Sequence, residues 1–345
     1  MPDRLADLTT LRLGGPAREL VHATSEQRLL DTVGEADSAG TPVLLVAGGS
    51  NLVVSDEGFD GTVVHVATTG VRVEQDTCGG AVVTVAAGET WDDLVARAVD
   101  EGWLGIEALS GIPGSVGATP IQNVGAYGQE VSETIASVRC WDRVLRGQRT
   151  FFAADCRFGY RTSRFKQDPG RHVVLDVTFQ FRLGDQGAPV QYAELARRLG
   201  VELGDRAPAA DVRSAVLALR AGKGMVLDPA DHDTWSAGSF FTNPMLDRDT
   251  AATLPADAPR WDQPDGTVKT SAAWLIEHAG FGKGYGNDRV ALSDKHTLAL
   301  TNRGGATTAD LLALAGEVQT GVLEAYGVRL VNEPVLVGCS LPVPA

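Results

Sequence analysis

The sequence has few of the residues that build metal centres and disulfide frameworks. Its four cysteines, at positions 78, 140, 156 and 339, form no C-x-x-C pair, and its six histidines are scattered. Neither residue type shows the spacing of a zinc ligand set. We therefore expect free thiols in a reducing cytoplasm, no metal ion and no catalysis by a Cys/His pair.

Long apolar runs are missing as well. Apolar stretches such as residues 42–47 and 335–337 are short, whereas a helix that spans a bilayer needs about 20 apolar residues. The N-terminal residues do not place a basic segment before an apolar one, so we expect no signal peptide. These features predict a cytoplasmic protein that has no membrane partner.

Positive charge is scarce relative to negative charge. The chain contains 30 lysine and arginine residues against 44 aspartate and glutamate residues, a formal net charge of −14. Nucleic acids and anionic membrane surfaces select basic proteins, so we expect no nucleic-acid partner. An anionic small molecule would have to bind in a locally basic pocket.

Glycine is the residue type in excess. It accounts for 40 of 345 residues, against about 7% in an average protein. The hydrophobic and charged fractions, 43% and 21%, are ordinary for a folded chain. Glycines cluster at residues 48–49, 111–128, 222–224 and 280–286. Such clusters can mark backbone that approaches a ligand closely, although a series of tight turns gives the same composition.

Short strands alternate with helices along the first 230 residues. Valine-rich segments predict strands, and apolar residues at helical spacing after a capping residue predict helices. The predicted strands cover residues 19–22, 42–47, 63–66, 81–86, 137–145 and 172–181, and the predicted helices begin near Thr24, at Thr90 and near Asp211. Later we expect helices over 271–279 and 308–326 and a last strand over 328–337. The pattern predicts an α+β fold, with a nucleotide-type module up to about residue 230 and a smaller second module.

Two glycine-rich segments could bind an anion through backbone N–H groups. The first, Gly-Gly-Ser-Asn at 48–51, follows an apolar strand and leads into another β-like run. The missing helix excludes a Rossmann motif, and a plain hairpin turn remains the alternative. The second spans residues 110–128, with five glycines and two prolines. It suits a pyrophosphate, and a structural Ω-loop is the alternative.

Three other segments carry candidate polar side chains. Residues 155–173 contain five cations and two acids, with aromatic residues between them; such a run is either a solvated basic face or part of a pocket for a carboxylate or phosphate. Ser239 lies between a glycine and two phenylalanines, without a nucleophile-elbow motif. Glu333 precedes a proline in an apolar run, so it is either an edge residue or a functional acid.

In this order, these segments resemble the bacterial UDP-N-acetylenolpyruvoylglucosamine reductases, the flavoenzymes called MurB. The resemblance covers residues 8–338 and includes the Tyr192 segment of the longer, type I members. It is carried by the Gly-Gly-Ser-Asn turn, Gly-Ile-Pro-Gly at 111–114, Pro-Ile-Gln-Asn-Val-Gly-Ala-Tyr-Gly at 120–128, Cys-Arg-Phe-Gly-Tyr-Arg at 156–161, Gly-Ser-Phe-Phe at 238–241 and Asn-Glu-Pro at 332–334.

The resemblance implies an α+β fold with a two-part FAD-binding module of the vanillyl-alcohol-oxidase type and a smaller α+β substrate domain. We expect FAD-binding subdomains at 1–75 and 76–230, a substrate-binding domain at 231–327, and a C-terminal strand and tail at 328–345. The implied reaction is the NADPH-dependent reduction of the enolpyruvyl ether of UDP-N-acetylglucosamine to UDP-N-acetylmuramate, in peptidoglycan precursor synthesis. The implied ligands are FAD, NADPH and the UDP-sugar, and we expect a monomer.

The resemblance also implies roles for individual residues. Arg161 and Glu333 would lie at the substrate carboxylate, and Ser239 would protonate the adjacent carbon as a general acid. FAD would be held by Gly48, Gly49, Ser50, Asn51, Leu52, Gly111, Ile112, Pro113, Gly114, Ser115, Val116, Gly117, Ala118, Thr119, Asn123, Gly125 and Ala126. The UDP-sugar would be held by Tyr127, Tyr192, Arg220, Lys223, Asn243 and Lys283. Thr242 departs from the pattern, because some members carry a lysine there.

Two other functions are alternatives to this reductase interpretation. An FAD-linked oxidase of small alcohols or sugars would keep the fold and change the reaction. A nucleotide-binding regulatory module would bind without catalysis, and it would not need the serine, arginine and glutamate set.

Overall fold

The computed structural model describes residues 4–76 and 80–342, and the chain divides into two compact units. Unit 1 comprises residues 1–17, 49–59 and 223–345, and unit 2 comprises residues 18–48 and 60–222. Two short N-terminal stretches therefore belong with the C-terminal third of the chain. The two units are built from five segments of the chain, whereas the expected domains are continuous segments with boundaries at residues 75, 230 and 327. Those boundaries remain predictions.

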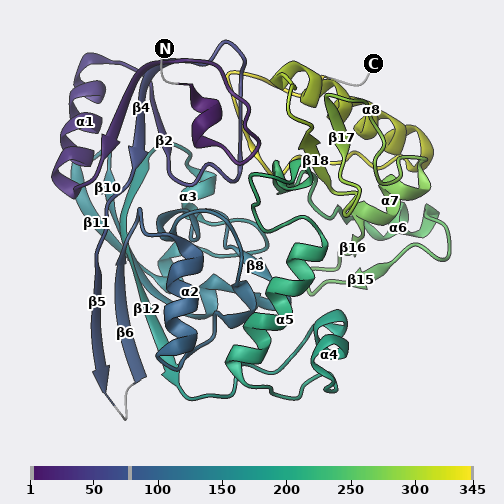
Figure 1. Ribbon diagram of the computed structural model, residues 1–345, viewed down its shortest axis with the longest axis horizontal. Helices are drawn as coiled ribbons and strands as arrows, with labels where there is room; N and C mark the ends of the chain where they lie inside the picture. The colour runs from purple at the N-terminus through teal and green to yellow at the C-terminus, as the bar shows by residue number, and fades with distance from the viewer. Residues whose placement is uncertain (1–3, 77–79, 343–345) are drawn as a thin grey trace. The chain divides into compact units, whose positions relative to one another are not determined.

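Unit 2 contains three sheets and the helices beside them (Figure 1). One sheet has the order β1-β4-β2, a larger one has the order β11-β10-β12-β6-β5 with β7 also paired to β12, and β8 pairs with β9 in a third. The strands are β1 (Ala17–Ala23), β2 (Val43–Val46), β4 (Phe59–Val66), β5 (Val71–Asp76), β6 (Gly80–Ala86), β7 (Trp103–Leu104), β8 (Gly125–Ala126), β9 (Gln129–Glu130), β10 (Ile135–Asp142), β11 (Gly147–Phe152) and β12 (His172–Leu183). The helices are α1 (Glu26–Ala39), α2 (Trp91–Asp100), α3 (Arg164–Gln167), α4 (Ala193–Leu199) and α5 (Ala209–Gly222).

The main core of unit 2 forms where α2 packs on the larger sheet. Trp91 and Leu94 of α2 join Val83 of β6 and Phe179 of β12 in one buried cluster. The apolar positions along α2 recur at helical spacing, which places them on one face. This packing fixes the residue 110–119 segment, because the Trp91 amide donates to the Gly114 carbonyl at 3.0 Å.

Unit 1 contains small sheets around a long helix. The strand orders are β13-β18-β17 and β14-β16-β15, and β19 pairs in parallel with β3. The strands are β3 (Leu52–Val54), β13 (Ser236–Ser239), β14 (Met245–Leu246), β15 (Arg260–Asp262), β16 (Val268–Thr270), β17 (Val290–Leu292), β18 (Ala299–Asn302) and β19 (Val335–Val337). The helices are α6 (Arg248–Thr253), α7 (Ala272–His278) and α8 (Thr308–Tyr326).

Helix α8 organises the core of unit 1. Its Leu311, Ala315 and Val318 are fully buried together with Phe240 and Leu292. A capping box begins the helix, and Gly327 ends it in the left-handed conformation at φ 66°. The predicted span 308–326 is confirmed.

The predicted last strand over 328–337 is wrong in its first seven residues. Only Val335–Val337 form β19, and the preceding segment, including Glu333, is irregular. Pro334 explains the late start, because proline has no N–H to give to a ladder.

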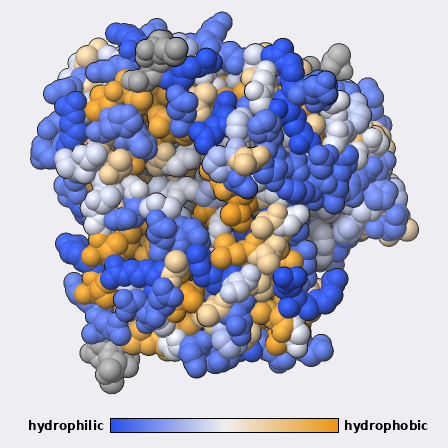
Figure 2. Space-filling view, in the orientation of Figure 1, coloured by the Kyte–Doolittle hydropathy of each residue, from blue (hydrophilic) through white to orange (hydrophobic). Residues whose placement is uncertain are grey.

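The surface is largely hydrophilic on the face shown in Figure 2, where hydrophobic side chains occur in separate patches. No helix within residues 4–76 and 80–342 is long and apolar enough to cross a membrane. The described residues also contain no group of three or more His, Cys, Asp or Glu side chains that could hold a metal ion.

The described cysteines are free. Cys140 and Cys156 are buried and Cys339 is half-buried, while Cys78 lies outside the described residues. Burial raises the pKa of Cys140 and raises that of Cys156 to about 12, so both stay protonated thiols at neutral pH.

Candidate active site

In unit 2, Gly48, the first residue of one segment predicted to bind FAD, lies directly against Gly114 of the other. A Cβ atom on Gly48 would lie only 2.5 Å from the Cα atom of Gly114. No side chain fits in that gap, so the approach of the two backbones itself requires glycine. In unit 1, the neighbouring Gly49 accepts a hydrogen bond from the Thr10 amide at 3.3 Å through its carbonyl.

Most amides of the residue 111–119 segment donate hydrogen bonds to other protein groups. The amides of Val116 and Gly117 donate to the carbonyls of Glu89 and Ala87, each at 2.9 Å. The Gly111 amide donates to the Asp92 carboxylate at 2.6 Å. The amides of Ala118 and Thr119 close a short 3-10 turn by donating to the carbonyls of Ser115 and Val116, at 3.1 Å each.

Ser115 is the exception in this segment. Its hydroxyl is buried and makes no hydrogen bond with any described residue, and the same holds for its own amide and for that of Gly114. An unpaired buried hydroxyl costs free energy, so Ser115 is a candidate contact for a ligand that supplies acceptors. An anion such as a pyrophosphate provides acceptors of this kind.

Asp92 fixes one end of this segment. It accepts hydrogen bonds from Arg213 of α5 at 2.7 and 2.9 Å, a two-pronged arrangement. Burial alone would raise the pKa of Asp92, but the hydrogen bonds from Arg213 and the Gly111 amide lower it overall. The aspartate therefore stays ionised and ties α2, α5 and the loop together.

Hydrogen bonds join the residue 157–166 segment to the residue 121–125 loop. Arg161 donates from Nη2 to the Gly125 carbonyl at 2.7 Å, and Asn123 donates from Nδ2 to the Gly159 carbonyl at 3.2 Å and to Glu130 at 2.6 Å. Asn123 is buried, whereas Arg161 is half-buried. The loop predicted to lie along the cofactor is thus held by the segment predicted to hold the substrate carboxylate.

Several of these residues have unusual backbone conformations. Only six described non-glycine residues have φ in the left-handed region, and three of them are Asn123 at 49°, Tyr127 at 50° and Arg161 at 51°. Such conformations cost free energy and concentrate at functional sites. Three residues predicted at the site are therefore among the six described residues with this strained backbone.

Most of the remaining basic cluster has a structural role. Arg171 pairs with Asp142 at 2.9 Å and with Asp168 at 3.1 Å. Arg164 is half-buried, and its guanidinium lies 4.6 Å from the ring centre of Phe151. The solvated-face interpretation is therefore wrong for Arg164, which packs on a ring.

The predicted substrate residues of unit 2 lie around the start of α4 and the end of α5. The rings of Tyr127 and Tyr192 meet edge to face, with centroids 5.5 Å apart. Arg220 is buried at the end of α5. Burial lowers the pKa of Arg220, against the opposing fields of Tyr127 and Asp92, and the guanidinium remains charged.

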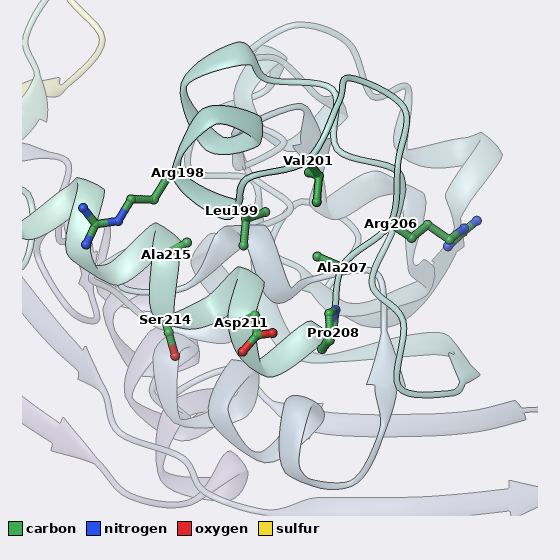
Figure 3. Close-up of a pocket in the computed structure, with 9 residues that line it drawn as sticks. All are labelled: Arg198, Leu199, Val201, Arg206, Ala207, Pro208, Asp211, Ser214 and Ala215. Carbon is green, nitrogen blue, oxygen red and sulfur yellow. The ribbon is translucent and has the colours of Figure 1, made fainter.

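A pocket of about 430 Å³ lies between α4, the loop after it and α5 (Figure 3). Leu199, Val201 and Ala215 contribute apolar lining. The side chains of Arg198 and Arg206 extend to opposite sides in Figure 3 and do not converge on a common point. This pocket contains none of the predicted site residues.

In unit 1, backbone pairing brings the residue 239–242 and 331–333 segments together. The Glu333 amide donates to the Phe240 carbonyl at 2.8 Å, and the Thr242 amide donates to the Val331 carbonyl at 3.0 Å. Ser239 ends β13 beside Ala299 of β18, after an irregular step in register. The two predicted catalytic residues of unit 1 therefore belong to neighbouring segments.

The turn at residues 49–52 joins the same region. The Val335 amide donates to the Asn51 carbonyl at 2.9 Å, and the Asn51 side chain donates to the Glu333 carbonyl at 3.4 Å. The parallel pairing of β19 with β3 continues this contact from Leu52 onward. The sequence alone gave no sign of this contact between residues about 280 positions apart.

The Ser239 hydroxyl has no hydrogen-bond partner among the described residues. The residue is half-buried, and Gly238 before it has φ 71°. A hydroxyl that is held by a strand and has no hydrogen bond is available to a ligand.

The remaining predicted substrate residues of unit 1 are spread along it. The Asn243 side-chain oxygen accepts a hydrogen bond from the Ala272 amide at 3.0 Å, so it caps α7. Lys223 is half-buried at the start of the C-terminal part of unit 1. Lys283 is exposed in a loop whose residues Gly284 and Gly286 line a cavity of about 400 Å³.

Two protein families match this chain, one in its N-terminal half and one in its C-terminal half. The FAD binding domain family matches residues 17–145, and the family described as UDP-N-acetylenolpyruvoylglucosamine reductase, C-terminal domain, matches residues 228–337.

Curated relatives extend over nearly the whole chain. A UDP-N-acetylenolpyruvoylglucosamine reductase of Cutibacterium acnes is 62% identical over 340 residues, covering 98% of this chain and 90% of the relative. The reductase of Streptomyces coelicolor is 57% identical over 348 residues, covering 98% and 90%.

A solved structure supports the fold. The crystal structure of MurB from Thermus caldophilus aligns with a TM-score of 0.66 at 24% identity and covers 97% of both chains. The predicted α+β fold and the assignment as an oxidoreductase with an FAD-binding domain are confirmed. The chain belongs to the UDP-N-acetylenolpyruvoylglucosamine reductase family.

Proposed function

We propose that the chain uses NADPH and bound FAD to reduce UDP-N-acetyl-3-O-(1-carboxyvinyl)-glucosamine to UDP-N-acetylmuramate. The observation that carries the proposal is the pairing of the Ser239 and Glu333 segments, in a chain whose curated relatives are named as reductases of this type. We further propose that it acts as a cytoplasmic monomer in peptidoglycan precursor synthesis.

The FAD site is proposed at the two glycine-rich segments. The Ser115 hydroxyl and the amides of Gly114 and Ser115, which have no partner among the described residues, are suited to the pyrophosphate oxygens. The other proposed contacts are Gly48, Gly49, Ser50, Asn51, Leu52, Gly111, Ile112, Pro113, Val116, Gly117, Ala118, Thr119, Asn123, Gly125 and Ala126. Bound FAD would carry a hydride from NADPH to the vinyl group of the substrate.

Arg161 and Glu333 are proposed at the substrate carboxylate. Reduction of the vinyl group places negative charge on the carbon next to that carboxylate. The planar guanidinium of Arg161 can bind a carboxylate with two hydrogen bonds and stabilise this charge as it develops. The half-buried position of Arg161 and its fixed hydrogen bond to Gly125 support this role.

Ser239 is proposed as the general acid. The carbon that gains negative charge needs a proton, and a hydroxyl held on a strand can deliver one. Its lack of a partner among the described residues supports the assignment.

The UDP-sugar is proposed to contact six further residues. The edge-to-face contact between Tyr127 and Tyr192 and the buried charge of Arg220 support a site for a nucleotide diphosphate. The full set is Tyr127, Tyr192, Arg220, Lys223, Asn243 and Lys283. With Thr242 in place of the lysine of some members, diphosphate binding would rest more heavily on the arginine and the lysines.

Absorbance measurements test the proposal. The purified protein should show a flavin spectrum, and NADPH oxidation should depend on the enolpyruvyl sugar and yield UDP-N-acetylmuramate by mass spectrometry. NADH in a parallel assay measures the preference for NADPH, and gel filtration measures the oligomeric state.

The two competing functions predict different results. An oxidase would reduce oxygen with an alcohol or sugar as the electron donor and would not need NADPH. A regulatory binder would bind a nucleotide without turnover. Either result would contradict the proposal.

A further inference from the structure

Tyr192 lies in a loop of unit 2 that runs from residue 185 to residue 209, between β12 and α5. We call this loop the Tyr192 excursion. Hydrogen bonds between its two ends close it: the Ala209 amide donates to Asp185 O at 2.8 Å, and the Gly187 amide donates to Ala207 O at 2.9 Å. A third bond runs from the Val190 amide to Asp205 O at 2.8 Å. Tyr192 directly precedes α4, which lies within the Tyr192 excursion.

The excursion is attached to the rest of unit 2 near Glu107. This residue begins a short 3-10 helix, Glu107–Leu109, just before the predicted FAD segment. Its side chain is buried, with 1% of the residue exposed, and its carboxylate makes no ion pair with any described cation. A buried charge of this kind is costly unless it is fully hydrogen-bonded.

Three donors from three different segments satisfy the Glu107 carboxylate. The Gly105 amide donates at 2.7 Å, the Gln129 side-chain amide at 2.8 Å, and the Ala188 amide at 2.7 Å. The Gln129 side-chain oxygen in turn accepts from the Ala108 amide at 2.7 Å. Both carboxylate oxygens of Glu107 and the side-chain oxygen of Gln129 therefore accept hydrogen bonds.

Two of these donors lie close in sequence to the tyrosines. Gln129 lies two residues after Tyr127, and Ala188 lies four residues before Tyr192. The segments are also packed closely, because a Cβ atom on Gly187 would lie 2.8 Å from the Glu107 carboxylate. One carboxylate thus sets the positions of both tyrosine-bearing segments.

We propose that Glu107 is a positioning residue for the UDP-sugar. It holds the Tyr127 loop and the Tyr192 excursion at the separation that brings the two rings into contact. The assignment of these tyrosines to the substrate rests on the proposed function. The anchoring of the two segments rests on the hydrogen bonds alone.

The chemistry of the site requires a carboxylate. All three partners are N–H donors, and an ionised carboxylate only accepts. In Glu107→Gln, the new amide group would point at least one donor toward another donor. We therefore expect the Tyr192 excursion to loosen, with little effect on the FAD segment.

Substrate kinetics provide the first test. In Glu107→Gln, we expect the KM for the enolpyruvyl UDP-sugar to rise about tenfold or more, as for a buried donor left unpaired. We expect kcat, flavin content and the rate of flavin reduction by NADPH to stay within about twofold of the wild type. The matched control is Glu202→Gln, which neutralises an exposed carboxylate of the same excursion and should leave all four quantities unchanged.

Hydrogen–deuterium exchange of the flavin-loaded protein provides the second test. Glu107→Gln should speed exchange in peptides that cover residues 186–206 and leave α2 peptides unchanged. If this variant does not fold, Glu107→Asp keeps the charge but shortens the reach, and it should change KM and exchange in the same direction.

The possible results separate the two proposals. An unchanged KM together with unchanged exchange would overturn the role of Glu107, as would parallel losses of flavin, kcat and melting temperature at constant KM. If the wild type does not reduce the enolpyruvyl sugar, the proposed function fails. The exchange experiment then still decides whether Glu107 anchors the excursion.

Discussion

Two predicted catalytic residues, Arg161 of unit 2 and Ser239 of unit 1, are held in opposite ways. In unit 2, Asn123 and Arg161 are fixed by hydrogen bonds to neighbouring segments, in strained backbone conformations. In unit 1, the Ser239 hydroxyl has no partner among the described residues. A fixed polar group positions a ligand, whereas a hydroxyl without a hydrogen bond is available to react.

This contrast fits the different roles proposed for the two residues. We infer that Arg161 orients the substrate carboxylate and that Ser239 delivers the proton. Substitutions at these two residues should therefore affect different measurable steps.

The largest effect is expected for Ser239→Ala. Loss of the general acid should lower steady-state turnover of the enolpyruvyl sugar by about 10²-fold or more, with flavin content unchanged. The measurement is NADPH oxidation at saturating substrate. Ser239→Cys keeps a proton donor and should recover part of the rate; turnover of Ser239→Ala near that of the wild type would remove Ser239 from the mechanism.

A smaller effect is expected for Arg161→Lys. Lysine keeps the charge but loses the two-pronged geometry and the fixed bond to Gly125, so kcat/KM for the sugar should fall by about tenfold. Arg157→Lys is a matched control, because Arg157 is exposed and has the same φ of 51°. If both variants behave alike, the carboxylate role of Arg161 is wrong.

Ser115→Ala should affect FAD binding without harming the apoprotein. The substitution removes a buried hydroxyl that has no partner, so the melting temperature of the apoprotein should stay the same or rise slightly. The dissociation constant for FAD, measured by titration of the apoprotein, should rise about tenfold.

Ser110→Ala is the matched comparison for Ser115→Ala. The Ser110 hydroxyl donates to the Glu107 carbonyl at 2.7 Å, so its loss should lower the melting temperature and leave FAD affinity nearly unchanged. Equal FAD affinity in the wild type and Ser115→Ala would place the pyrophosphate elsewhere.

The smallest effect on turnover is expected for Asp142→Asn, at the last residue of β10. Hydrogen bonds from Arg171 hold the pKa of Asp142 at about 2, below the value of about 3.9 in an unfolded chain. Its stabilisation is therefore complete above about pH 4 and is lost as the pH falls toward 2.

Urea unfolding of Asp142→Asn should show a loss of about 2 kcal/mol at pH 7 that shrinks only below about pH 4. Turnover per flavin should not change at pH 7. A loss of turnover without a loss of stability would contradict this structural role.

The sequence predicted local structure better than it predicted contacts. Helix α8 was predicted to the residue because an apolar face is bounded by a capping residue and by Gly327. Strand β19 was predicted too early because the apolar pattern continues through the residues before Pro334, where no ladder forms.

The site was predicted as a list of residues, and their partners were not predicted. Nothing in the local pattern indicates that Asn51 contacts Glu333, or that Arg161 binds the Gly125 carbonyl. Such contacts depend on the packing of distant segments, which residue spacing along the chain does not encode. The role of Glu107 was not predicted for the same reason, because its three hydrogen-bond donors come together only in the folded chain.

Stopped-flow absorbance of the flavin in Ser239→Ala tests the division of roles most directly. We expect NADPH to reduce the flavin at nearly the wild-type rate, because that half-reaction transfers no proton to carbon. Reoxidation by the enolpyruvyl sugar should be slower by about 10²-fold or more. Equal slowing of both half-reactions, or of neither, would show that Ser239 is not the general acid.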